Sequence, residues 1–130
     1  MNLPSEDIKD MLLTAGLGLA FKTNLFVHSE PILPDNCVTV YVTPGFSPDG
    51  TLSKGEEVWR PAIQVKVRNR SSQAAGALID SIKVFLHNRA GEIWNGAKYM
   101  LIQCDQEPFP LGFDESSRSQ WVCNFSIQRQ

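Results

Sequence analysis

The stretch of residues 60–88 changes abruptly from a two-residue hydrophobic repeat to a helical one. In its first half apolar and polar side chains alternate, as in a strand with one buried face. The apolar members are Ile63, Val65 and Val67, and the polar members are Gln64, Lys66 and Arg68. Ser71 or Ser72 can then cap the N-terminus of a helix. Apolar residues recur along this helix at helical spacing and form one stripe, made of Ala75, Leu78, Ile79, Ile82, Phe85 and Leu86. The helix must therefore pack on the apolar side of the strand.

Further elements flank this unit on both sides. A first amphipathic helix is predicted near the N-terminus, ending before Gly16 and Gly18. Strands are predicted over residues 25–28, 37–43, 99–104 and 121–129. This order indicates an α+β fold, with a mainly antiparallel twisted sheet of four to five strands and two helices packed on one face. We expect the aromatic side chains of Trp94, Trp121 and Phe125 to lie in its core.

Composition predicts a single globular domain over residues 1–130. The chain has 42% hydrophobic and 20% charged residues, and it is long enough to bury a core of ordinary size. Its net charge of -2 gives no electrostatic basis for sequence-independent binding to DNA. The apolar stretch 11–21 is interrupted by polar residues and glycines and has no basic leader, which argues against a signal peptide. We therefore expect the protein to be intracellular where it is made.

The three cysteines, Cys37, Cys104 and Cys123, are an odd number and lie in strand-like runs without CxxC spacing. This pattern predicts buried free thiols in a reducing compartment instead of a disulfide framework. The sequence also lacks the GxSxG, P-loop and HExxH motifs, and no cluster of His, Cys and acidic residues has the spacing of metal ligands. The prediction is a protein that is not an enzyme, without catalytic, cofactor-binding or metal-binding residues.

Two surfaces are candidates for contacts with partners. Gln64, Lys66, Arg68 and Arg70 share the polar face of the central strand, which could be solvated, could meet a neighbouring subunit or could form a weak phosphate-binding strip. Residues 44–57, PGFSPDGTLSKGEE, are predicted to form a long loop. Loops of this length are usually functional or disordered, so this segment is a partner contact, a tolerated surface insertion or a mobile hairpin tip.

Several pieces of the chain, in their order and spacing, resemble a known family. They are RPAIQVKVRNRS, an amphipathic helix ending in LHN, WNGAKY, PFPLGFDESSR and WVCNFSIQR. Residues 60–129 resemble in these respects the small tail terminator proteins of long-tailed bacteriophages, also described as minor capsid or tail completion proteins. That family has no catalytic signature, so the resemblance transfers no active-site residue.

The resemblance implies a structural virion protein at the head-proximal end of the phage tail, assembled in the host cytoplasm. Members form homo-hexameric rings that close the tail tube, end its polymerisation and offer a docking surface to the head–tail connector proteins. The implied partners are the tail tube protein and these connector proteins, and DNA passes through the lumen without sequence-specific binding. No cofactor and no membrane contact is implied.

We therefore expect interface residues in two groups of opposite charge. The basic group comprises Lys66, Arg68 and Arg70 beside Gln64, and the acidic group comprises Asp49, Glu56 and Glu57. Reversing Lys66 and Arg68 to Glu is predicted to weaken assembly without unfolding the monomer. The alternatives are another neck or head-completion protein of the virion, and a small ligand-binding or enzymatic α+β domain, which a deep pocket with converging polar groups would reveal.

Overall fold

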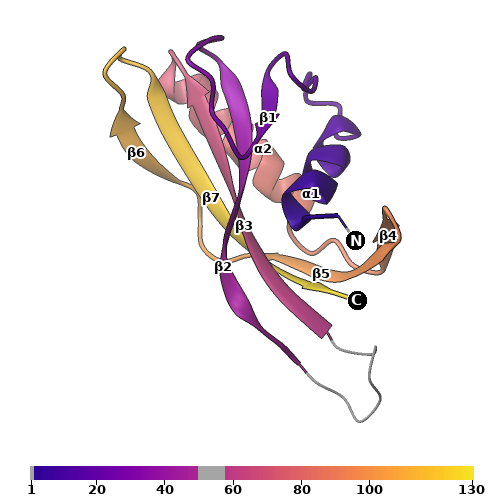
Figure 1. Ribbon diagram of the computed structural model, residues 1–130. Coiled ribbons are helices and arrows are strands. Elements are labelled where there is room, and N and C mark those ends of the chain that lie inside the picture. The colour runs from indigo at the N-terminus through magenta and orange to yellow at the C-terminus, as the bar shows by residue number, and fades with distance from the viewer. Residues whose placement is uncertain (1, 50–57) are drawn as a thin grey trace.

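The computed structural model describes residues 2–49 and 58–130 (Figure 1). Two helices and seven strands follow one another along these described residues. Their bounds are α1 (Pro4–Leu13), β1 (Leu25–Val27), β2 (Cys37–Asp49), β3 (Val58–Asn69), α2 (Ser72–Leu86), β4 (Glu92–Trp94), β5 (Ala97–Cys104), β6 (Phe109–Phe113) and β7 (Ser119–Arg129). Among the described residues, no helix is both long and apolar enough to cross a membrane.

The predicted α+β class is confirmed, but the sheet is mixed and larger than expected. Its seven strands run in the order β1-β2-β3-β7-β5-β4, and β6 pairs with β7 beside β5. The prediction of four to five strands is therefore wrong. The short strand β1 is parallel to β2, whereas the other paired strands are antiparallel, as predicted.

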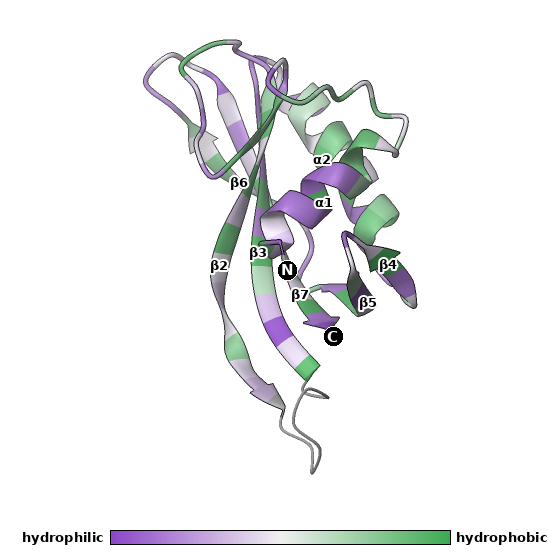
Figure 2. Ribbon diagram, turned by 45° about the vertical axis from the view of Figure 1, so that its right-hand side comes forward, coloured by the Kyte–Doolittle hydropathy of each residue, from purple (hydrophilic) through white to green (hydrophobic). Residues whose placement is uncertain are grey.

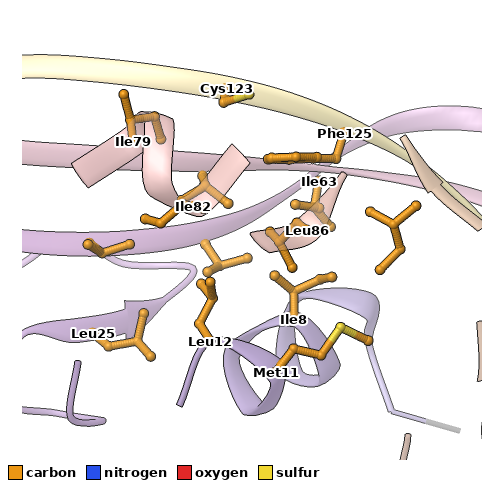
Figure 3. Packing of buried hydrophobic residues seen from close by; sticks show 14 of the residues in the cluster. Ile8, Met11, Leu12, Leu25, Ile63, Ile79, Ile82, Leu86, Cys123 and Phe125 are labelled. Atoms are coloured by element: carbon orange, nitrogen blue, oxygen red, sulfur yellow. The ribbon is translucent and has the colours of Figure 1, made fainter. Parts of the chain in front are cut away.

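The predicted unit of strand and helix at the centre of the chain is confirmed as β3 followed by α2. The hydroxyl oxygen of Ser71 caps α2 by accepting a hydrogen bond of 3.2 Å from the backbone N–H of Ala74. Both helices lie on the same face of the sheet (Figure 1). They reach it with fully buried apolar side chains, α1 against β1, β2 and β3 and α2 mainly against β3 and β7. Figure 3 shows Ile8, Met11, Leu12, Ile79, Ile82 and Leu86 in this cluster.

The aromatic assignments to the core also hold. Phe125 is fully buried in the cluster between helices and sheet, and Trp94 and Trp121 are partly buried against it. The indole of Trp121 lies so close to α2 that a Cβ atom at Gly76 would come within 3.3 Å of its ring.

The predicted loop 44–57 is an extension of the hairpin over the part that the structure describes. Strand β2 continues from Thr43 to Asp49, and β3 begins at Val58. Register shifts on either side of Phe46 bend β2, so that this edge strand can hold Pro44 and Pro48, which cannot donate ladder hydrogen bonds. The two strands project from the body as an arm, formed by residues 42–49 and 58–62 (Figure 1).

Candidate assembly surfaces

The polar face of β3 is largely covered within the chain. The connector, residues 29–36, crosses this face between the parallel strands β1 and β2. The carboxylate of Glu30 in the connector forms ion pairs with Lys66 at 3.3 Å and with Arg68 at 3.0 Å. Gln64 of β3 donates a hydrogen bond of 2.9 Å to the side chain of Asn124 on the neighbouring strand β7.

Arg68 holds the connector by its backbone. Its guanidinium donates hydrogen bonds to the carbonyl oxygens of Ile32, Pro34 and Asp35 at 3.3, 2.7 and 3.2 Å. The Arg68 side chain is only 3% exposed. A buried guanidinium needs this number of acceptors, because an unpaired buried charge is strongly destabilising.

Two further arginines, Arg70 and Arg118, bind the same segment. The guanidinium of Arg70 pairs with the Asp35 carboxylate at 2.6 Å, and this contact lowers the pKa of Asp35 below its ordinary value. Arg118, from the turn between β6 and β7, donates to the carbonyl of Ile32 and pairs with Asp114 at 2.8 Å. The connector is thus tied to β3 and to the start of β7.

Within the described chain, Lys66, Arg68 and Arg70 meet Glu30 and Asp35 of the connector. The contacts expected of the basic strip and of the segment 44–57 are contacts with other subunits or with the tube, so they stay a prediction. Asp49 forms the end of β2 in the arm, whereas Glu56 and Glu57 lie outside the described residues. The sequence SEPILPDN contains both connector carboxylates, but their partners follow only from the parallel pairing of β1 and β2, which the sequence did not reveal.

The connector presents two large apolar side chains to solvent. Ile32 is 82% exposed and Leu33 is 70% exposed, although the backbone around them is held by buried arginines. Their exposure is therefore a property of a fixed segment. Contiguous exposed apolar residues on a fixed surface are typical of contact sites.

The arm carries a second apolar surface. Phe46 is 78% exposed, Trp59 46% and Val42 45%, and Figure 2 shows hydrophobic segments interspersed along the arm, beyond the part of the sheet that the helices cover. These three side chains line a groove of about 480 Å³ at the base of the arm. Arg60 and Arg129 also line the groove, and none of its described lining residues is acidic.

The strands of the arm lie very close together at Gly45. A Cβ atom built there would be 2.3 Å from the carbonyl oxygen of Arg60, well inside van der Waals contact. Only glycine fits at this position without a shift of the backbone. The shape of the groove therefore depends on Gly45.

The opposite side of the sheet has an open strand edge at β6. Among the described residues, β6 pairs only with β7, and its exposed side chains include Leu111 and Phe113. On the other side, β1 pairs with β2 only at Val38–Val40, so most of the outer edge of β2 is also open in the described chain. Open edges offer unpaired N–H and C=O groups to another strand.

A buried polar cluster joins α1 to the sheet. The carboxylate of Asp7 is fully buried and accepts hydrogen bonds from the Tyr99 hydroxyl and from Asn95 (2.6 Å), and it pairs with Arg129 at 3.3 Å. Burial raises the pKa of Tyr99, and the hydrogen bond to Asp7 raises it further. The cluster fixes the position of α1 by satisfying a buried charge. Among the described residues, no group of three or more His, Cys, Asp or Glu side chains is placed to hold a metal ion.

The sequence model of a family described as bacteriophage tail terminator protein matches residues 6–130, which is nearly the whole chain. The chain belongs to the bacteriophage tail terminator family. Members are structural proteins of the phage tail and are typically not enzymes, so this terminator protein is a structural component of a virion. The family resemblance read from residues 60–129 is thereby confirmed and extends further toward the N-terminus.

Solved structures share the fold of this terminator protein at low sequence identity. A chain in the structure titled "Virion of native gene transfer agent (GTA) particle" is 11% identical, with a TM-score of 0.68, and the match covers 97% of this chain and 93% of that chain. A second solved structure is 13% identical, with a TM-score of 0.59, over 97% of this chain and 89% of the other. No curated protein sequence matches.

Proposed function

We propose that this protein closes the head-proximal end of the tail tube as a homo-hexameric ring, ends tube polymerisation and offers the surface on which the head–tail connector docks. The observation that carries the proposal is a pair of surfaces, on opposite sides of one small domain, that no other part of the described chain covers. One is the groove of the arm, with Phe46 and Trp59, and the other is the open edge of β6, with Leu111 and Phe113.

These two surfaces can pair as strand edges. Most of the charges beside them are already paired within the chain, Glu107 with Lys83, Asp114 with Arg118 and Arg129 with Asp7, so the apolar side chains carry the match. Both surfaces combine an open strand edge with exposed apolar side chains. We infer that β6 of one copy lies along the arm of the next, adding its strand to the outer edge of β2.

A contact between two different surfaces of the same molecule is heterologous, and such contacts form a closed ring when the rotation between neighbours closes. About six copies, the number implied by the family resemblance, need a rotation of about 60° at each contact. A net charge of -2 suits a ring through which DNA passes without being held tightly.

The basic residues take an indirect part in this arrangement. Lys66, Arg68 and Arg70 hold the connector, which keeps Ile32 and Leu33 in place as a contact surface for the tail tube protein. Gln64 supports the same face through Asn124. Asp49, Glu56 and Glu57 are proposed as contacts to a neighbouring copy or to the tube.

The capping function is tested with tail tubes polymerised from the cognate tube protein, with and without this protein, and imaged by negative-stain electron microscopy. Capping predicts that tubes stop growing and carry added ring density at one end. Tubes that lengthen equally in both samples and show two bare ends would contradict the proposal.

A further inference from the structure

Two thiols of the described chain lie in contact. The sulfur atoms of Cys104 and Cys123 are 3.2 Å apart, and both cysteines are free. Cys104 is the last residue of β5, and it lies opposite Phe125 in the pairing of β5 with β7. Because side chains alternate along a strand, Cys123 points to the same side as Phe125, and the two thiols meet diagonally across the strand pair.

The surroundings of the pair distinguish its two members. Cys104 is partly exposed and its thiol donates to the carbonyl oxygen of Gln106 at 2.8 Å, whereas Cys123 is fully buried. Burial raises the pKa of the Cys123 thiol, and the neighbouring Cys104 raises it further. Cys37 is on β2, which β3 separates from β7, so only one pairing of cysteines is available.

We propose that Cys104 and Cys123 are an oxidative modification site that closes into an intrachain disulfide when the protein meets a low-molecular-weight disulfide. A disulfide has an S–S distance of about 2.05 Å, so the sulfur atoms must approach by about 1 Å. The position of Cys104 at the end of β5, where the chain leaves the sheet, makes room for this movement.

The chemistry is two successive exchanges. The thiolate of Cys104, the accessible member, attacks the small disulfide and releases one thiolate, which gives a mixed disulfide at Cys104. Cys123 then loses its proton, attacks the Cys104 sulfur and releases the second small thiolate. In total the two protein thiols lose two electrons and two protons, and the small disulfide is reduced to two thiols.

The bond would close a loop that contains β6. The bond would join the end of β5 to β7, so that residues 105–122, which include β6, form a closed loop between the two cysteines. A cytosol keeps thiols reduced and an extracellular medium does not. The bond therefore forms after release of the particle and, if the ring contact proposed above is right, fixes the strand that we assign to it.

Peptide mapping tests the site directly. The full-length protein is incubated with oxidised glutathione, blocked with an alkylating agent and digested with trypsin without reduction. Cleavage after Lys98, Arg118 and Arg129 separates Cys104, in residues 99–118, from Cys123, in residues 119–129. The proposal predicts that these two peptides are recovered joined, and that the intact monomer loses about 2 Da.

Two variants serve as controls. Cys37→Ser should give the same joined peptides as the wild type, and Cys104→Ser should give none, with thermal unfolding of the reduced proteins checking that both variants fold. A glutathione adduct that persists at Cys104, a link to the peptide that contains Cys37, or dimers joined between chains would overturn the proposal. Each of these outcomes is independent of whether rings or capped tubes form, so the two proposals fail separately.

Discussion

Arg68 determines how the polar face of the sheet is built. Its buried guanidinium is bound by three backbone carbonyls and by the Glu30 carboxylate in place of water. Through these contacts it orders the connector, which has no secondary structure of its own. Removing one partner of a buried ion pair leaves the others unsatisfied. The expectation that Lys66 and Arg68 could be reversed to Glu without unfolding the monomer therefore needs revision for Arg68.

We predict that Arg68→Leu lowers the free energy of unfolding by about 3 kcal/mol, because Glu30 and the connector carbonyls lose their buried donor. Arg70→Leu is the matched control, since the Arg70 side chain is 62% exposed and an exposed ion pair contributes about 0–1 kcal/mol. Urea unfolding measures both losses. Equal losses for the two variants would contradict the role given to Arg68.

Asp7 has the corresponding role on the helix side of the sheet. Asp7→Asn should destabilise the protein by about 3 kcal/mol, since Arg129 would lose its buried counter-charge. Asp10→Asn, on the same helix and also hydrogen-bonded to Asn95, should cost less than about 1 kcal/mol because that carboxylate is partly exposed. The comparison is made by chemical denaturation, and a small loss for Asp7→Asn would show that the cluster is not needed to hold α1.

At the scale of elements, the arm depends on the absence of a side chain at Gly45. Gly45→Ala should force β2 and β3 apart and cost about 1–3 kcal/mol through overpacking. Ser47→Ala, at an exposed position of the same strand, should be nearly neutral. Amide hydrogen exchange in the strands of the arm provides the readout, and unchanged protection in Gly45→Ala would contradict the close packing described above.

The elements with a strong period were predictable from the sequence, and those without one were not. The alternation around Ile63, the stripe of α2 and the aromatic face of β7 each reflect burial against a single partner layer. Strand β6, FPLGF, contains Pro110 and Gly112 and reads as a turn, because its pairing depends on the edge of β7 alone. The arm was taken for a loop for a similar reason, since bulges accommodate its prolines.

The assembly surfaces were only partly predictable, because they arise from tertiary contacts. The polar strip was recognised, but its partners are carboxylates from a segment more than thirty positions away in sequence. The groove combines side chains from β2, β3 and the end of β7, and no local pattern marks that combination.

At the scale of the whole molecule, a heterologous contact makes a specific prediction for mixtures. Phe46→Asp should disable the groove and Phe113→Asp should disable the β6 surface, and burying an ionised side chain in place of Phe should weaken self-association at least about tenfold. A mixture of the two variants should form heterodimers through the one intact contact but no ring. Val84→Asp, an exposed site on α2, is the control that should assemble normally.

Size-exclusion chromatography with light scattering distinguishes these species. The assignment of the surfaces would be contradicted if either variant assembled as the wild type does, or if Val84→Asp failed to assemble while remaining folded. In that case the family membership and the proposed capping role would stand, and the interface would lie elsewhere on the molecule.

The most direct test of the central claim is native mass spectrometry of the wild-type protein over a range of concentrations, alone and with purified tail tubes. The account predicts a closed ring of about six copies, either free in solution or bound at one end of the tube. A protein that stays monomeric at every concentration and does not bind tube ends would contradict it.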